Sequence, residues 1–131
     1  MRQLGKARRD KQSSSLSPKT DSASVFAEEL AARVRIILRS AGNIREQKMF
    51  GGIGFMLDGN LLAGASRRGL LIRTGKDRKP EALAWPHSRP MVMRGRSMEG
   101  YVYIDPPGAS EEAVRACVRI ARAFVETLPR K

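Results

Sequence analysis

Two side chains of this sequence are of types that catalyse reactions near neutral pH: its one histidine, His87, and its one cysteine, Cys117. An imidazole acts as a general base because its ordinary pKa lies close to 7. No serine or cysteine stands at a motif spacing that would make it the nucleophile of His87, which lies between prolines in an expected loop. Cys117 falls on the apolar stripe of an expected helix, where a thiol behaves as a small hydrophobe. We therefore expect a surface histidine and a core cysteine.

Metal and cofactor chemistry has little support in the residue types. A single cysteine excludes an internal disulfide, and one cysteine with one histidine cannot complete a four-ligand structural zinc site. Glu111 and Glu112 form the nearest approach to a carboxylate pair, but adjacent helical positions point about 100° apart. Their place at the start of an expected helix suits the helix dipole instead. We expect no metal and no cofactor.

Three glycines lie close together in Gly51-Gly52-x-Gly54. Glycine-rich loops of this kind can bind a phosphate through their backbone N–H groups. The stretch lacks the Lys-Ser/Thr pair of a P-loop, and its spacing does not match the dinucleotide fingerprint. A tight bend or bulge where a strand enters a sheet explains the same glycines. Gly59 follows Asp58 in a two-residue hairpin signal. We interpret all four glycines as structural.

The formal net charge is +12, from 25 lysines and arginines against 13 acidic residues. Residues 1–20 hold six basic residues against one aspartate, a net charge of +5, so the remainder carries +7. A field of this sign favours nucleic acid, anionic lipid or an acidic protein, and a basic surface without such a partner is the alternative. The candidate partner-binding residues are Arg8, Arg9, Lys11, Arg67, Arg68, Arg73, Arg94, Arg96, Arg115, Arg119 and Arg122.

The spacing of some residues along the sequence predicts which face of a helix or strand they share. Arg115, Arg119 and Arg122 recur at intervals of four and three, so they share the outer face of one helix, with ordinary surface pairs to nearby glutamates. Tyr101 and Tyr103 alternate along an expected strand and so lie on one sheet face. Exposed tyrosines there would stack on nucleic-acid bases, whereas half-buried packing is the commoner arrangement and the one we favour.

The elements that position these residues follow from periodicity and turn signals. Residues 1–20 are polar and Ser-rich, so we expect a basic tail that does not pack, followed by one domain over 21–131. The tail has no apolar stretch typical of a secretory signal, and no run of 18 apolar residues occurs, so we expect a cytoplasmic protein. Helices are expected over 21–40, 76–84 and 110–128, and strands over 49–50, 53–57, 61–65, 70–73, 89–93 and 101–104. This order predicts a two-layer α+β domain with helices packed on an antiparallel sheet.

At Met49-Phe50-Gly51-Gly52, Gly54-Phe55, Asp58-Gly59, Leu70 to Arg73 and Gly100 to Tyr103, the sequence resembles the N-terminal domain of the TfoX/Sxy competence-regulator family. The resemblance runs from roughly residue 26 to residue 128. It implies a five-stranded antiparallel sheet with helices on one side, similar to secretion-chaperone-like folds. It also implies a part in regulation similar to that of the competence regulators, although a shared fold does not itself carry function.

The sequence therefore favours a non-enzymatic binding or regulatory domain whose partner is a protein or a nucleic acid, with no membrane partner. The alternative is a small enzyme or ligand-binding protein that acts on an anionic substrate through arginines and His87. That function requires a concave pocket that gathers these side chains. A purely structural or dimerisation module is a third interpretation.

Overall fold

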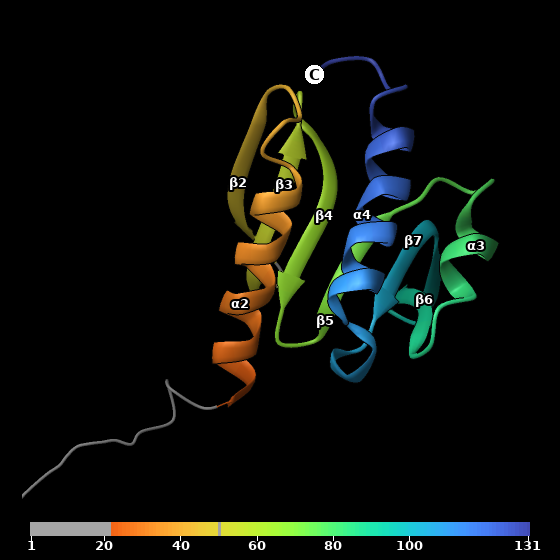
Figure 1. Cartoon of the computed structure of the whole chain (residues 1–131). Helices are drawn as coiled ribbons and strands as arrows, with labels where there is room; N and C mark the ends of the chain where they lie inside the picture. Colours follow the sequence, from red (N-terminus) through yellow and green to blue (C-terminus); the bar gives the residue numbers. More distant parts are fainter. Residues whose placement is uncertain (1–21, 50) are drawn as a thin grey trace, which may run out of the picture.

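The described residues form one open antiparallel sheet covered on one face by three α-helices (Figure 1). The computed structural model describes residues 22–49 and 51–131, so the tail over 1–20, with Arg8, Arg9 and Lys11, lies outside the described residues. The elements are α2 (Ser22–Ile37), β2 (Ile44–Met49), β3 (Gly52–Leu57), β4 (Asn60–Ser66), β5 (Gly69–Arg73), α3 (Lys79–Leu83), β6 (Ser88–Met93), β7 (Arg96–Ile104), a 3-10 turn η2 (Pro106–Gly108) and α4 (Glu111–Val125).

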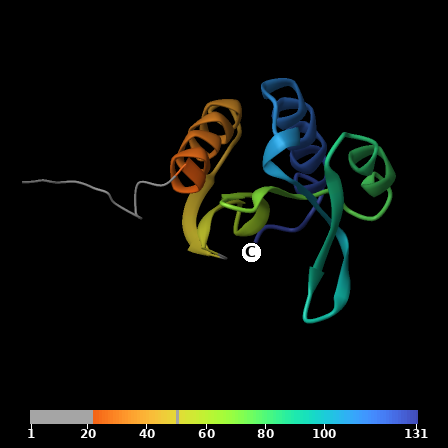
Figure 2. The same ribbon diagram turned by 90° about the horizontal axis from the view of Figure 1, so that it is seen from below.

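The sheet has the strand order β2-β3-β4-β5-β7-β6, and every neighbouring pair is antiparallel. Short hairpins join β2 to β5 in sequence, whereas α3 and β6 intervene before β7 returns to pair with β5. The predicted α+β class and antiparallel sheet are confirmed, with six strands where the resemblance implied about five. Figure 2 shows all three helices on the same side of the sheet.

The main core lies between the helices and the sheet. Phe55, Ala63, Ile72 and Val102 stand opposite one another across four strands, and each is fully buried. Residues on the neighbouring rows point to the other face because side chains alternate along a strand. α2 packs mainly against β4 and α4, and α4 packs against β4 and β5. The residues that carry the fold are thus the alternating apolar positions of the strands and one stripe on each long helix.

A smaller apolar cluster covers part of the opposite sheet face. Leu71, Met91 and Tyr103 are buried there, with Leu61 and Tyr101 packed against them. Arg89 lies over the Tyr103 ring at 5.1 Å and donates to Asp105 at 2.8 Å. The face away from the helices therefore has its own short core, which holds β6 and β7 to β5.

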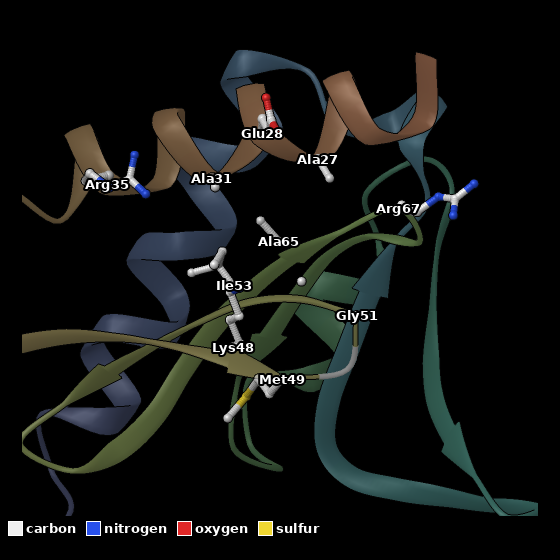
Figure 3. A pocket seen from close by; sticks show the side chains of 11 residues that line it. Ala27, Glu28, Ala31, Arg35, Lys48, Met49, Gly51, Ile53, Ala65 and Arg67 are labelled. Carbon is white, nitrogen blue, oxygen red and sulfur yellow. The ribbon is translucent and has the colours of Figure 1, made fainter. Parts of the chain in front are cut away.

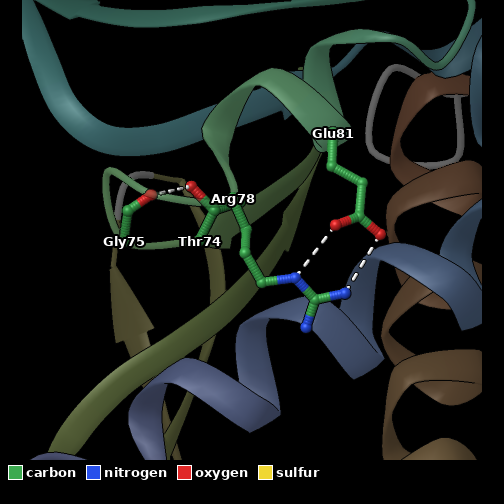
Figure 4. A network of polar contacts seen from close by, with 4 residues as sticks. All are labelled: Thr74, Gly75, Arg78 and Glu81. Carbon is green, nitrogen blue, oxygen red and sulfur yellow. Dashed lines mark hydrogen bonds and ion pairs between the residues drawn. The ribbon is translucent and has the colours of Figure 1, made fainter.

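Several expected elements differ in length from the structure. The strand expected over 49–50 is instead β2 over Ile44–Met49, because this edge strand is built mostly from exposed polar residues that give no apolar signal, and α2 ends at Ile37, three residues before the expected end. The expected helix over 76–84 is confined to α3, with Pro80 in its first turn, and the residues before it form turns. The buried hydroxyl of Thr74 donates to the carbonyls of Gly75 and Gly100. Figure 4 shows the first of these bonds beside the Arg78–Glu81 ion pair of α3. β7 begins at Arg96, five residues before the expected strand, because Arg94 and Gly95 both adopt positive φ and close a tight hairpin.

The last helix begins and ends close to the predicted positions. Ser110 caps α4 by accepting a hydrogen bond from the Ala113 backbone N–H at 3.1 Å. The regular helix ends at Val125, three residues before the expected end, and the chain turns there. Among the described residues, the helices are all too short or too polar to span a bilayer.

Candidate functional site

A cleft of about 620 Å³ lies between α2 and the turn that joins β2 to β3. It exists because α2 lies over β4 and leaves the inner side of the β2–β3 hairpin partly uncovered. Small side chains keep it open: Ala27 and Ala31 face it from α2, and Ile53 and Ala65 form its floor (Figure 3). The apolar floor of the cleft is suited to contact with an apolar group of a ligand or partner.

Charged groups of both signs surround this cleft. Arg35 on α2 donates to both carboxylate oxygens of Glu46, at 2.5 and 2.8 Å, and this bond holds the pKa of Glu46 below its ordinary value. Glu28 and Lys48 also line the cleft, and neither has an ion-pair partner in the described part of the chain. Arg67 lies at the far end. Because the signs are mixed, the cleft is no dedicated anion-binding site.

The four glycines singled out in the sequence, of which Gly51 and Gly52 line the cleft, have structural explanations of two kinds. Gly51 adopts a φ of +73° and Gly59 one of +86°, conformations that favour glycine in tight turns. Gly52 does not need a positive φ, but a Cβ there would collide with the carbonyl oxygen of Ala65. A Cβ at Gly54 would meet the side chain of Met49, which lies across it. The structural interpretation of these glycines therefore accounts for all four, by turns or by close approach.

A second candidate site lies on the outer side of α4. One hollow of about 270 Å³ separates α4 from the end of α2, and a second of about 520 Å³ separates α4 from the segment after α3. Arg115 and Arg119 line both hollows, and Arg122 lines the first. Ile36, with 59% of its surface exposed, borders one side, and half-buried Trp85 borders the other. We call these five residues, together with Ile37, the α4 surface.

Within the described residues, two of the three arginines on the α4 surface form ion pairs and the third does not. Arg115 donates to Glu111 at 3.1 Å and Arg122 donates to Glu126 at 2.9 Å, which are the predicted pairs across one helical turn. Exposed pairs of this kind add little stability. Arg119, between them, has no ion pair or hydrogen bond among the described residues. The acidic residues thus lie toward the two ends of α4. In the middle of the surface, the positive charge of Arg119 has no acidic partner among the described residues.

The other candidate arginines do not join this surface. Arg67 and Arg68 occupy the turn between β4 and β5, and Arg94 and Arg96 occupy the tip of the β6–β7 hairpin, all exposed. Arg73 is half-buried, with its guanidinium 5.6 Å from the Tyr101 ring and 5.7 Å from the Phe124 ring. The eight candidate arginines in the described residues therefore form separate groups on the β4–β5 turn, the β6–β7 hairpin tip, the sheet and α4.

The two tyrosines share one sheet face as predicted, yet they are packed. Tyr103 is only 4% exposed, and Tyr101 is half-buried under Arg73. Stacking on a base needs an open ring face. The packing interpretation of this pair is therefore confirmed.

His87 and Cys117 lie apart from both candidate sites. His87 is exposed in the loop before β6, with a φ of +63°, and it lines neither the cleft nor the α4 surface. Cys117 is fully buried under α4, and burial raises the pKa of its thiol to about 11. In the described part of the chain, no three His, Cys, Asp or Glu side chains are placed to hold a metal ion. Among the described residues, neither the cleft nor the two hollows beside α4 bring arginines together with His87, as the enzymatic alternative requires.

Sequence reasoning missed three residues that help to form these sites. Ile36 belongs to a helix on which Leu30 and Val34 are buried in the core, so its own exposure signals a contact surface only once the packing is known. Trp85 is the one tryptophan, a residue enriched at binding sites, and composition could have drawn attention to it. Lys48 became notable only when the register of β2 placed it on the helix-facing side of the sheet.

Comparison with known proteins gives one match. The family model described as the TfoX N-terminal domain matches residues 37–126, from the last residue of α2 through α4. No curated protein and no solved structure matches the chain. The matched segment contains the glycine-rich turn and all the strands, while the α2 wall of the cleft lies outside it. Because this segment spans well over half of the sequence, the chain belongs to the TfoX N-terminal domain family.

Proposed function

We propose that this chain is a non-enzymatic binding domain of the regulatory kind and that its α4 surface contacts an acidic protein partner in the cytoplasm. Membership of the TfoX N-terminal domain family supports a regulatory or binding role. The observation that carries the proposal is the placement of Arg119, without a partner in the described residues, between exposed Ile36 and half-buried Trp85. Tryptophan and arginine flanked by apolar contacts are typical of the residues that dominate protein interfaces.

The test replaces Arg119 by glutamate in the full-length chain. We expect binding to the partner to weaken by about thirtyfold, since reversal of a central interface charge costs on the order of 2 kcal/mol. The matched control is Arg96→Glu, which changes the net charge equally but lies on the hairpin tip. The measurement is a pull-down from native cytoplasm with and without nuclease, followed by titration of the captured partner. Equal loss with both variants would mean that overall charge, and not the α4 surface, directs binding.

A second candidate partner is nucleic acid, favoured by the net charge of +12. A base-reading motif such as a zinc finger is absent from the sequence, so this binding is non-specific, at roughly 10⁻⁴–10⁻⁶ M in physiological salt. Removal of the partner by nuclease in the pull-down would favour this function over the protein partner.

Deleting residues 1–20 tests where such nucleic-acid affinity resides. If the five net charges of this segment contact phosphates, its removal flattens the plot of log affinity against log salt by about 4.5. The same variant is expected to melt within a few degrees of the full chain, because the segment has very few large apolar side chains to bury. Fluorescence anisotropy on two unrelated duplexes and one single strand measures the slope. Tight, sequence-selective binding by the shortened chain would contradict the assignment.

A further inference from the structure

The two edges of the sheet differ in their readiness to accept another strand. β6 carries Pro90, and its register against β7 shifts between Pro90 and Val92. Prolines and bulges of this kind block strand addition. β2 pairs with β3 without any shift from Ile44 to Met49 and contains no proline. Within the described residues, β2 is hydrogen-bonded to a strand on one side only, so it is the intact edge.

Four consecutive residues on this edge are exposed and polar: Arg45, Glu46, Gln47 and Lys48. Glu46 and Lys48 point to the helix-covered face because they stand opposite Phe55 and Ile53, both of which pack in the main core. Arg45 and Gln47 point to the other face. Polar side chains therefore occupy the helix-facing side of β2, where the neighbouring strands carry apolar residues.

Symmetry limits how a second copy can extend the sheet at β2. A two-fold axis perpendicular to the sheet pairs the two β2 strands antiparallel and keeps each side chain on its own face. One residue then lies on the axis, opposite itself. If Arg45, Glu46 or Lys48 occupies that position, like charges meet directly, which destabilises a strand pair. Gln47 on the axis places a neutral side chain there and sets Glu46 of each copy opposite Lys48 of the other.

We propose that this chain forms a two-fold dimer through β2, with Gln47 on the axis, so that the two sheets become continuous. The inference is independent of the α4 surface. Lys48 has no ion pair among the described residues and gains a carboxylate, while Glu46 keeps Arg35 on one side and gains Lys48 of the second copy on the other. Because Lys48 lines the cleft beside α2, the second copy also extends the wall of that cleft.

The experiment measures molar mass of the full-length chain by sedimentation over a dilution series. The unaltered chain is expected to approach twice its monomer mass as concentration rises. Lys48→Glu and Glu46→Lys each replace two attractive pairs by two repulsive ones and are expected to weaken the dimer by about tenfold or more. Mixing the two variants restores the opposite-charge pairs, so the mixture is expected to dimerise where neither variant alone does.

Arg45→Glu is the matched control, because its side chain lies on the other face, opposite Met49 of the second copy, and is expected to leave the dimer intact. Lys48→Glu removes no bond within the chain, so its result stands even if loss of the Arg35 pair unfolds Glu46→Lys. Amide exchange in residues 45–49 is expected to slow as concentration rises. A chain that stays monomeric, or a dimer that tolerates Lys48→Glu, overturns the proposal.

Discussion

Gly52→Val is expected to lower the free energy of unfolding by about 1–3 kcal/mol, the usual cost of forcing atoms into a packed site. A Cβ at Gly52 would collide with the carbonyl oxygen of Ala65 and lie 2.7 Å from the Cβ of Ser66. The obstacle is the backbone of β4, so it cannot rotate away, and relief requires β3 and β4 to separate. Urea denaturation followed by circular dichroism measures the change.

Substitutions at two other glycines distinguish the cost of steric overlap from the cost of a strained backbone. Gly51→Ala introduces strain alone, because φ is +73° but nothing lies within 4 Å of the added Cβ, and about 1–2 kcal/mol is expected. Gly42→Ala introduces neither and is expected to leave stability nearly unchanged or slightly raised. If Gly52→Val unfolds at the same urea concentration as the unaltered chain and instead loses affinity for an anion, the turn is a ligand loop and the structural interpretation is wrong.

Local signals predicted most of the fold. Asp58-Gly59 predicts a hairpin because both central residues of its turn need positive φ, and the structure gives +51° and +86°. α4 is predicted by its Ser110 cap and its apolar stripe, which pack as expected. These features depend on a few neighbouring residues, so the sequence alone is sufficient to find them.

Tertiary contacts decided the features that the sequence did not reveal. Gly52 was expected to need an unusual backbone conformation, whereas its requirement is space for the Ala65 carbonyl on the next strand. The buried hydroxyl of Thr74 donates to the carbonyl of Gly100, 26 residues further along the chain. Such contacts form only when the sheet order is set, and periodicity carries no information about that order.

The candidate sites also depend partly on local sequence signals and partly on tertiary contacts. The spacing of Arg115, Arg119 and Arg122 placed them on one helical face, but nothing local indicated that the end of α2 would bring exposed Ile36 beside them. The cleft is set by where α2 crosses the sheet, and its wall residue Lys48 looked like an ordinary exposed lysine. The charge count does not say where the basic residues lie, and the fold distributes the candidate arginines among several separate groups.

Cys117 is expected to react with a thiol reagent roughly a thousandfold or more slowly in the native chain than in the unfolded one, since reaction requires an opening of the structure. Its side chain is fully buried beside Val114, Val118 and Ala121 in the main core. The measurement compares labelling rates with and without denaturant at neutral pH. Immediate complete labelling of the native chain would show that α4 does not present this face to the sheet.

The same burial predicts how stability changes in alkali. Burial raises the pKa of the Cys117 thiol from an ordinary value of 9.0 to about 11, with the Glu81 carboxylate adding to the shift. Below pH 9 the thiol is protonated in both states, so its contribution to stability is complete. Between about pH 9 and 11 the unfolded chain loses this proton while the native chain keeps it, so stability falls as pH rises, by about 3 kcal/mol for a shift of this size. Cys117→Ala removes the titrating group while keeping a small apolar side chain, and its unfolding free energy is expected to fall less over this range than that of the unaltered chain. Parallel pH profiles for the two proteins would mean that the native thiol ionises as readily as an unfolded one, and hence that water reaches it beneath α4.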